Sequence, residues 1–145
     1  MRAVLQRVTR ASVSVAGRSV GEIGPGLVVL VGVAPDDGDR EVETLARKVA
    51  ELRILRGERS VLDVLAVGEP AAILLISQFT LLADVRKGRR PSWNGAAPGP
   101  VAEPFVAALA DALRRRGVPV TEGVFGATMA VELVNDGPVT IVVDV

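Results

Sequence analysis

The chain has 145 residues, a length that suits one domain with a substantial core. Its 17 basic and 17 acidic residues cancel to a net charge of zero, which excludes a polycation that coats nucleic acid over its whole surface. It contains no cysteine and no histidine, so disulfides, thiolate metal sites, the common zinc sites and Ser-His-Asp or Cys-His catalysis are excluded.

The first third of the chain is expected to form short strands. Val13 and Val15 alternate with serines, Ala16-Gly17 offers a turn, and an apolar segment returns up to Ile23. The near-continuous apolar run 27–33 predicts a strand that is buried on both faces. Because aromatic residues make up only 3% of the chain, aliphatic side chains must supply most of the core.

A helix is expected to open at the acidic segment 36–39, because negative charge favours a helix N-terminus. Apolar residues from Val42 to Leu52 then recur at spacings of three and four, which is the period of a buried helical stripe. Three segments follow: 53–68 shows no clear pattern, 71–78 predicts a buried strand, and 83–100 is a loop rich in Gly, Pro and Arg.

A second helix is predicted to start near Pro104 and to end at Gly117, which is placed as its C-terminal cap. The remaining strands are expected on either side of segment 135–140, whose Gly137-Pro138 pair should stop ladder pairing or form a turn. Many strands with two helices do not fit an alternating βαβ fold, so two sheets with the helices covering one of them are expected. We predict one domain over residues 1–145, with its last strands at 118–124, 127–134 and 139–145.

Polar residues follow the predicted strand 71–78, at the end where α/β proteins tend to place ligands. Ser77 and Thr80 are the hydroxyl candidates in this segment, but without a histidine base either one is a poor nucleophile at neutral pH. On the residues alone, the segment Ser77-Gln78-Phe79-Thr80 either terminates a strand or forms part of a site.

Four positive charges fall within five residues of the expected loop, at Arg86, Lys87, Arg89 and Arg90. Such a run is commonly solvated surface, although beside a nucleic-acid site it would neutralise phosphates. No aromatic residue interleaves with these charges, so contact with the RNA backbone without base readout is expected.

Five motifs are spread over essentially the whole chain: the first strand 1–8, the turn 21–27, the segment 77–81, the basic segment 86–92 and the segment 125–140. In this order they resemble the D-aminoacyl-tRNA deacylase family. Two departures stand out: Glu58-Arg59-Ser60 occupies the place of Lys-Met-Asn in many members, and Leu82 that of Tyr. The resemblance implies an α/β fold, a strand-rich three-layer β/β/α sandwich with two main helices, assembled as a homodimer.

The resemblance also implies the reaction. Such an enzyme hydrolyses the ester of D-aminoacyl-tRNA, and of glycyl-tRNA mischarged on tRNA(Ala), releasing the amino acid and tRNA. In the family, backbone amides around Phe79 and Thr80 form an oxyanion hole, which can contribute about 3–4 kcal/mol per donor, and the ribose 2′-hydroxyl assists. A cis Gly137-Pro138 bond enters the active site of the other subunit, captures the amino group and leaves no room for an L side chain.

Residue roles follow from the same resemblance. The catalytic motif is Ser77, Gln78, Phe79 and Thr80; the substrate-binding residues are Gly137, Pro138, Arg7 (which braces their loop), Met129 and Phe125; and Arg86, Lys87, Arg89 and Arg90 bind tRNA.

No metal or cofactor is expected, because Asp84, Glu132 and Asp136 lie far apart in sequence and show no metal-loop spacing. Chelators should therefore leave the activity unchanged. Nothing resembles a signal peptide and no apolar run approaches the length of a membrane span, so we expect a cytoplasmic protein without a membrane partner. Two alternatives stay open: an L-amino-acid editing module of the threonyl-tRNA synthetase type, and a non-catalytic RNA-binding protein that uses the basic loop.

Overall fold

The computed structural model describes all 145 residues and shows a mixed α/β fold dominated by one six-stranded sheet. The strand order is β2-β1-β3-β4-β5, and β6 also pairs with β1. In chain order the elements are β1 (Arg2–Val15), β2 (Arg18–Ile23), β3 (Gly26–Gly32), α1 (Asp39–Glu51), α2 (Val61–Ala66), β4 (Ala72–Ser77), the 3₁₀ turn η1 (Phe79–Leu82), α3 (Gly99–Arg115), β5 (Val120–Glu122) and β6 (Met129–Asp144).

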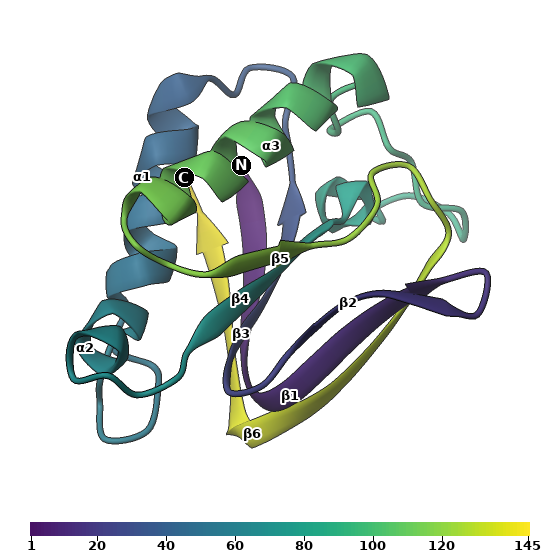
Figure 1. Cartoon of the computed structure of the whole chain (residues 1–145). Helices are drawn as coiled ribbons and strands as arrows, with labels where there is room; N and C mark the ends of the chain where they lie inside the picture. Colours follow the sequence, from purple (N-terminus) through teal and green to yellow (C-terminus); the bar gives the residue numbers. More distant parts are fainter.

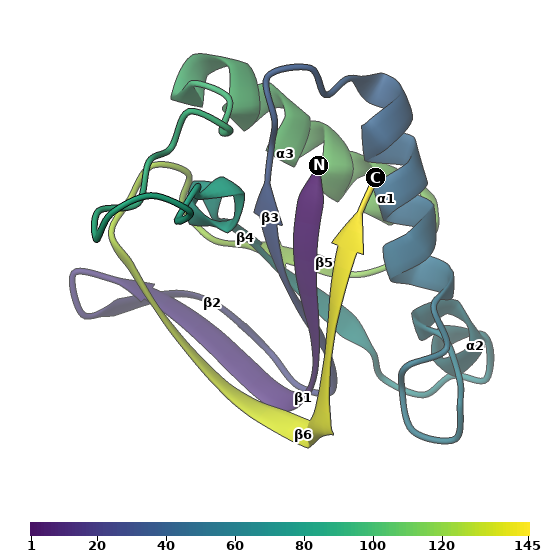
Figure 2. The ribbon, with the colours of Figure 1, turned by 180° about the vertical axis from the view of Figure 1, so that it is seen from behind.

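Strand β1 is long enough to belong to two parts of the sheet. Its residues 2–8 pair with β3, its residues 11–15 pair with β2, and β6 runs antiparallel to it along almost its whole length. The sheet therefore folds over itself, and the β1–β2 hairpin with the first half of β6 lies across one face of the rest (Figures 1 and 2). The sequence predicted two sheets; the structure joins them through β1 into one barrel-like sheet.

The alternation of side chains along the parallel strands β3 and β4 separates two cores. Val29 and Leu75 face the larger cluster, which α1 and α3 cover, whereas Val28 and Leu74 face a smaller cluster beneath the β1–β2 hairpin. All four side chains are at most 1% exposed, as the prediction of a strand buried on both faces requires.

Helix α3 differs from the prediction at its N-terminal end. Helix α3 begins at Gly99 rather than near Pro104, with Pro100 in its first turn, where a missing N–H costs nothing. Pro104 lies inside the helix, and its lack of an N–H removes only the bond to the carbonyl of residue 100. The helix ends as predicted, because Gly117 takes a φ of +82° directly after it. No helix is both long and apolar enough to cross a membrane.

Two further segments depart from the sequence prediction. The stretch 53–68 contains α2, whose N-cap Ser60 accepts a hydrogen bond of 3.0 Å from the Asp63 amide. Segment 135–140 does not end the ladder: β6 continues through it, and the extra residues are absorbed by register shifts opposite β1 residues 6–10. The break is therefore a bulge within a strand and not a turn between two strands.

Candidate functional site

A cavity of about 430 Å³ opens where β4 ends, beside the start of α3. Its lining is mainly apolar and includes Ser77, Gln78 and Phe79 of the predicted motif together with Phe125. A larger hollow of about 830 Å³ lies between β2 and the first half of β6, but it contains none of the predicted site residues. The cavity at the end of β4 is therefore the candidate site.

The turn η1 supplies donors at the edge of this cavity. Phe79 and Thr80 are its first two residues, and the first amides of a helical turn have no partner within the turn. Gln78 is held to the sheet by a bond of 2.7 Å from its amide to the Val31 carbonyl, and its side-chain amide donates to the Thr80 hydroxyl. The backbone is thus fixed at the end of β4, where Phe79 lines the cavity and Thr80 lies next to it in the turn but is not among the lining residues.

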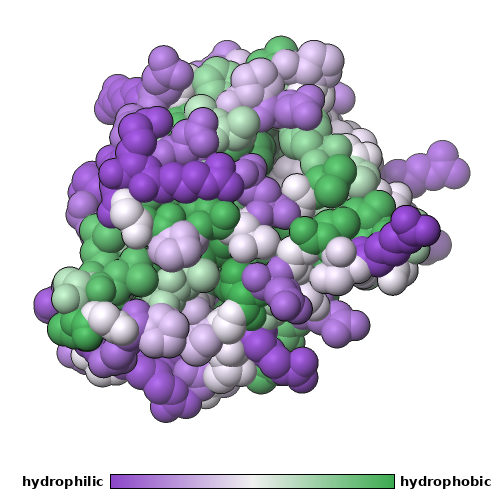
Figure 3. Space-filling model, viewed as in Figure 1, coloured by the Kyte–Doolittle hydropathy of each residue, from purple (hydrophilic) through white to green (hydrophobic).

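Aromatic side chains concentrate at the cavity. The chain has three phenylalanines, one tryptophan and no tyrosine, and three of these four rings, Phe79, Trp93 and Phe125, line it. Phe79 and Trp93 meet edge to face with ring centroids 5.3 Å apart, yet they remain 54% and 42% exposed. Hydrophobic surface gathers below the start of α3 on this side of the molecule, rimmed by hydrophilic side chains (Figure 3). Trp93 was not predicted from the sequence, although its position three residues after Arg90 was a usable signal.

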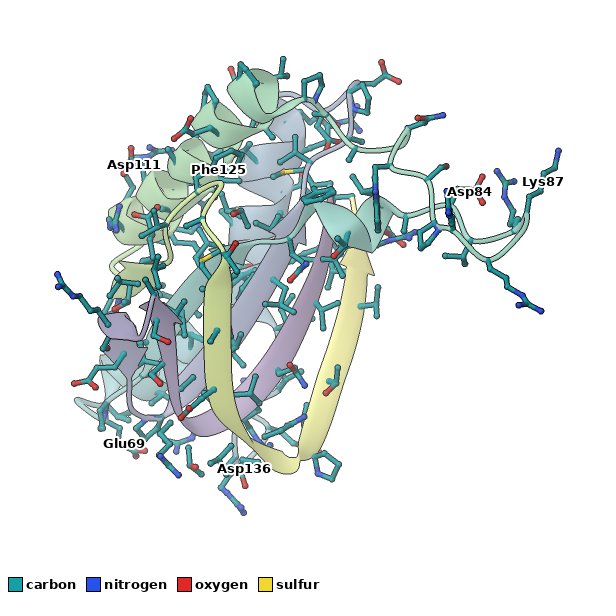
Figure 4. All side chains as sticks on the ribbon, turned by 90° about the vertical axis from the view of Figure 1, so that its right-hand side faces the viewer. Glu69, Asp84, Lys87, Asp111, Phe125 and Asp136 are labelled. Carbon is teal, nitrogen blue, oxygen red and sulfur yellow. The ribbon has the colours of Figure 1, made fainter.

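The basic loop is a hairpin that projects from the body of the protein (Figure 4). Asp84 and Ser92 close it through two backbone hydrogen bonds of 2.9 and 3.0 Å. Arg86 donates back to Asp84 at 2.9 and 2.6 Å, and these bonds hold the pKa of that carboxyl below its usual value. Lys87, Arg89 and Arg90 are exposed and take part in no salt bridge, so three of the four predicted cations are free.

The loop of Gly137 and Pro138 is braced from two sides, and its peptide bond is cis, as predicted. Arg7 donates to the Asp136 carbonyl at 3.0 Å and to the Ile54 carbonyl at 3.1 Å. Arg56 makes a bidentate pair with the Asp136 carboxylate at 2.9 and 2.5 Å, which is the first cause of the lowered pKa of Asp136. Gly137 and Pro138 themselves stay exposed at the end of the molecule.

This loop lies far from the cavity within one chain. Val8 follows Arg7, which braces the loop, and pairs with Gly26; Gly26 in turn pairs with Ala72 at the start of β4. The loop is therefore near the start of β4, whereas Ser77 of the motif lies five residues further along that strand. At about 3.3 Å per residue the two ends of β4 are about 17 Å apart. Phe125 and Asp136 mark these opposite ends in Figure 4.

Met129 is not among the residues that line the cavity; it packs half-buried against the smaller core cluster. The two departures from the family pattern have structural partners of their own. Arg59 pairs with Glu69 through two bonds of 2.8 Å, and Ser60 caps α2. Leu82 packs at the end of η1 beside the backbone of Gly95. No group of three or more Asp and Glu side chains comes close enough together to hold a metal ion.

Comparisons with known proteins agree with this architecture. Residues 4–144 match the family described as D-Tyr-tRNA(Tyr) deacylase. The chain is 66% identical to a D-aminoacyl-tRNA deacylase of Kineococcus radiotolerans and 65% identical to one of Beutenbergia cavernae, in each case over 99% of both chains. A solved structure described as a "c-Myc DNA Unwinding Element Binding Protein" is 40% identical and superimposes with a TM-score of 0.91 over 100% of this chain and 99% of that one. A second, of "a probable eukaryotic D-amino acid tRNA deacylase", is 18% identical, has a TM-score of 0.82 and matches in fold over 99% and 98% of the two chains.

Proposed function

Because the chain belongs to the D-Tyr-tRNA(Tyr) deacylase family, we propose that it hydrolyses the ester between a D-amino acid and the terminal ribose of tRNA. The observation that carries the proposal is the cavity at the end of β4, where aromatic walls stand beside the unpaired amides of η1. Phe79 and Phe125 offer apolar faces for the terminal adenine, and η1 offers hydrogen bonds to the adjacent ester.

The reaction needs no protein nucleophile. Water attacks the ester carbonyl, and the oxyanion that forms accepts hydrogen bonds from the Phe79 and Thr80 amides. The carbon–oxygen bond to the ribose then breaks, the ribose oxygen takes up a proton, and the free amino acid and tRNA leave. With no histidine in the chain, the neighbouring ribose 2′-hydroxyl helps to position the water. Ser77 and Gln78 hold the turn in place.

Chirality is selected by the loop of Gly137 and Pro138 from a second copy of the chain. Within one chain this loop lies beyond the start of β4 and the motif at its end, and the two ends of that strand are about 17 Å apart, so the loop can reach a cavity only in a partner subunit. The free edge of β6, with Val142 62% exposed, provides a surface for a homodimer. Backbone carbonyls of the loop bind the α-ammonium group and exclude an L side chain, whereas glycine, including glycine mischarged on tRNA(Ala), passes.

The remaining predicted residues have supporting roles in this arrangement. Arg7 holds the loop, and Met129 supports the pocket wall from the smaller core cluster. The basic hairpin receives acceptor-stem phosphates through Lys87, Arg89 and Arg90, with Arg86 held by Asp84.

The test is turnover by the purified protein of three substrates: D-tyrosyl-tRNA, L-tyrosyl-tRNA and glycyl-tRNA(Ala). We expect hydrolysis of the first and third and sparing of the second. Preferential hydrolysis of the L ester would make the protein an L-amino-acid editing module. Binding of tRNA without hydrolysis of any of the three would make it a non-catalytic RNA-binding protein.

A further inference from the structure

Trp93 is exposed although it is the largest aromatic side chain of this protein. It is the only tryptophan of the chain and leaves 42% of its surface open to solvent, edge to face against Phe79. An exposed aromatic pair in a chain with four aromatic residues is not needed for the core, which aliphatic side chains fill. Such a pair suits stacking against a planar ligand.

The cavity behind this pair has room for one nucleoside. Its volume of about 430 Å³ is at the small end of ligand pockets, and the terminal adenosine with its aminoacyl group already occupies it under the proposed function. The nucleotide that precedes the adenosine must therefore lie outside, on the rim of the cavity.

Charge decides on which side of the rim it lies. Beyond Phe125 a second hollow of about 320 Å³ is bordered by Glu103, whose carboxylate has no cationic partner and repels phosphate, and by Glu122, which is paired with Arg114 at 2.6 Å. On the other side stands the hairpin, whose Lys87, Arg89 and Arg90 have no acidic partner. Trp93 directly follows Ser92, the last residue of the hairpin's closing pair, and so lies between the free cations and the cavity.

We propose that Trp93 is a stacking site for the base that precedes the terminal adenosine of tRNA, and that Lys87, Arg89 and Arg90 bind the phosphates leading to it. This subsite rests on the proposed function and adds a path for the single-stranded 3′ end, from the hairpin over Trp93 into the cavity. Stacking accepts any base, and the unpaired 3′ end is common to all tRNAs, so the site needs no hydrogen-bond readout.

The kinetic test compares two substrates with the same ester, a D-aminoacyl-adenosine and a D-aminoacyl trinucleotide with the tRNA 3′ sequence. Trp93→Leu should lower kcat/KM for the trinucleotide relative to the adenosine ester by about 5- to 150-fold, mainly through KM, because the variant no longer stacks on one base. Trp93→Phe should keep most of the preference. The matched control is Val20→Ala on β2, where Val20 is also 42% exposed; it should leave the ratio unchanged.

A binding measurement on the wild-type protein does not depend on a variant folding. Since Trp93 is the only tryptophan, its fluorescence reports on this site alone. A non-hydrolysable trinucleotide should quench it much more strongly than adenosine does. An unchanged substrate ratio in Trp93→Leu, or equal quenching by adenosine and trinucleotide, would overturn the subsite. If the proposed function is wrong, the wild type hydrolyses neither ester, and the quenching still tests the binding of single-stranded RNA at Trp93.

Discussion

Phe79 contributes two different groups to the candidate site, a backbone amide and an aromatic ring. The two can be separated because Phe79 is the first residue of η1, where proline is tolerated, and the preceding Gln78 is not helical, with φ −146° and ψ 76°. Phe79→Ala removes the ring and keeps the N–H, whereas Phe79→Pro removes both. If the amide stabilises the oxyanion, kcat of Phe79→Pro should fall about 10²- to 10³-fold below that of Phe79→Ala. Single-turnover hydrolysis of D-tyrosyl-tRNA measures this, and equal rates in the two variants would remove the amide from the mechanism.

The hydroxyl of Thr80 has a smaller role in the same turn. It accepts a hydrogen bond from the Gln78 side chain, which orients it but supplies no base. Thr80→Ala should therefore lower kcat by no more than about 10-fold, the effect of one ordinary hydrogen bond. The rate is compared with that of Ser77→Ala under the same conditions. Complete loss of hydrolysis in a folded Thr80→Ala protein would instead identify Thr80 as nucleophile or base.

At the scale of elements, the bulge of β6 is tied to the segment after α1 by charge. Hydrogen bonds from Arg56, supported by the charge of Arg7, lower the pKa of Asp136. A carboxylate whose folded pKa is lowered stabilises the fold above its unfolded pKa and loses this contribution as pH falls through the folded value. The free energy of unfolding of the wild-type protein should therefore exceed that of Asp136→Asn by a constant amount at neutral pH. This difference between the two proteins should narrow below about pH 4. Urea unfolding at a series of pH values measures the gap, and a gap that does not change with pH would contradict the ion pair.

The basic hairpin is a second element with a measurable role. Replacing Lys87, Arg89 and Arg90 together with Ala should weaken tRNA binding and reduce the magnitude of the log–log salt slope by roughly 0.7–0.9 for each phosphate that the protein no longer neutralises. Arg86→Ala should change the slope less, because Asp84 already neutralises Arg86. The matched control replaces Arg10, Arg40 and Lys48, three cations that form no salt bridge and do not line the cavity. If both triple variants reduced the salt slope equally, the effect would come from the change in net charge, and the hairpin would not be the tRNA-binding surface.

Sequence periodicity predicted those elements whose pattern is local. The stripe from Val42 to Leu52 and the apolar run 27–33 gave α1 and β3, because each buries side chains at its own fixed spacing. The continuity of β6 through Gly137 was not predictable in this way. It depends on the pairing of β6 with β1, whose register shifts to accommodate the extra residues of β6. The position of Trp93 at the cavity was missed for the same reason: its contact with Phe79 joins two segments that only the fold brings together.

At the scale of the whole molecule, the motif and the loop that we propose to act on one substrate lie at opposite ends of each chain. A homodimer should therefore show complementation between two defective chains. Phe79→Pro disables the motif and leaves the loop intact. Gly137→Ala disables the loop and leaves the motif intact: at a φ of +130°, a Cβ would lie 2.9 Å from the Val139 side chain and 3.0 Å from Arg7.

Each variant on its own should form inactive dimers, because every site then lacks one of its two parts. A mixed dimer, purified through a different affinity tag on each chain, contains one site with an intact motif from the Gly137→Ala chain and an intact loop from the Phe79→Pro chain. Because the two sites of a twofold dimer are equivalent, this dimer should show about half of the wild-type activity on D-tyrosyl-tRNA. A mixed dimer as inactive as its parents, or a wild-type protein that is monomeric by light scattering, would mean that no loop crosses between subunits and that the D ester is selected within one chain.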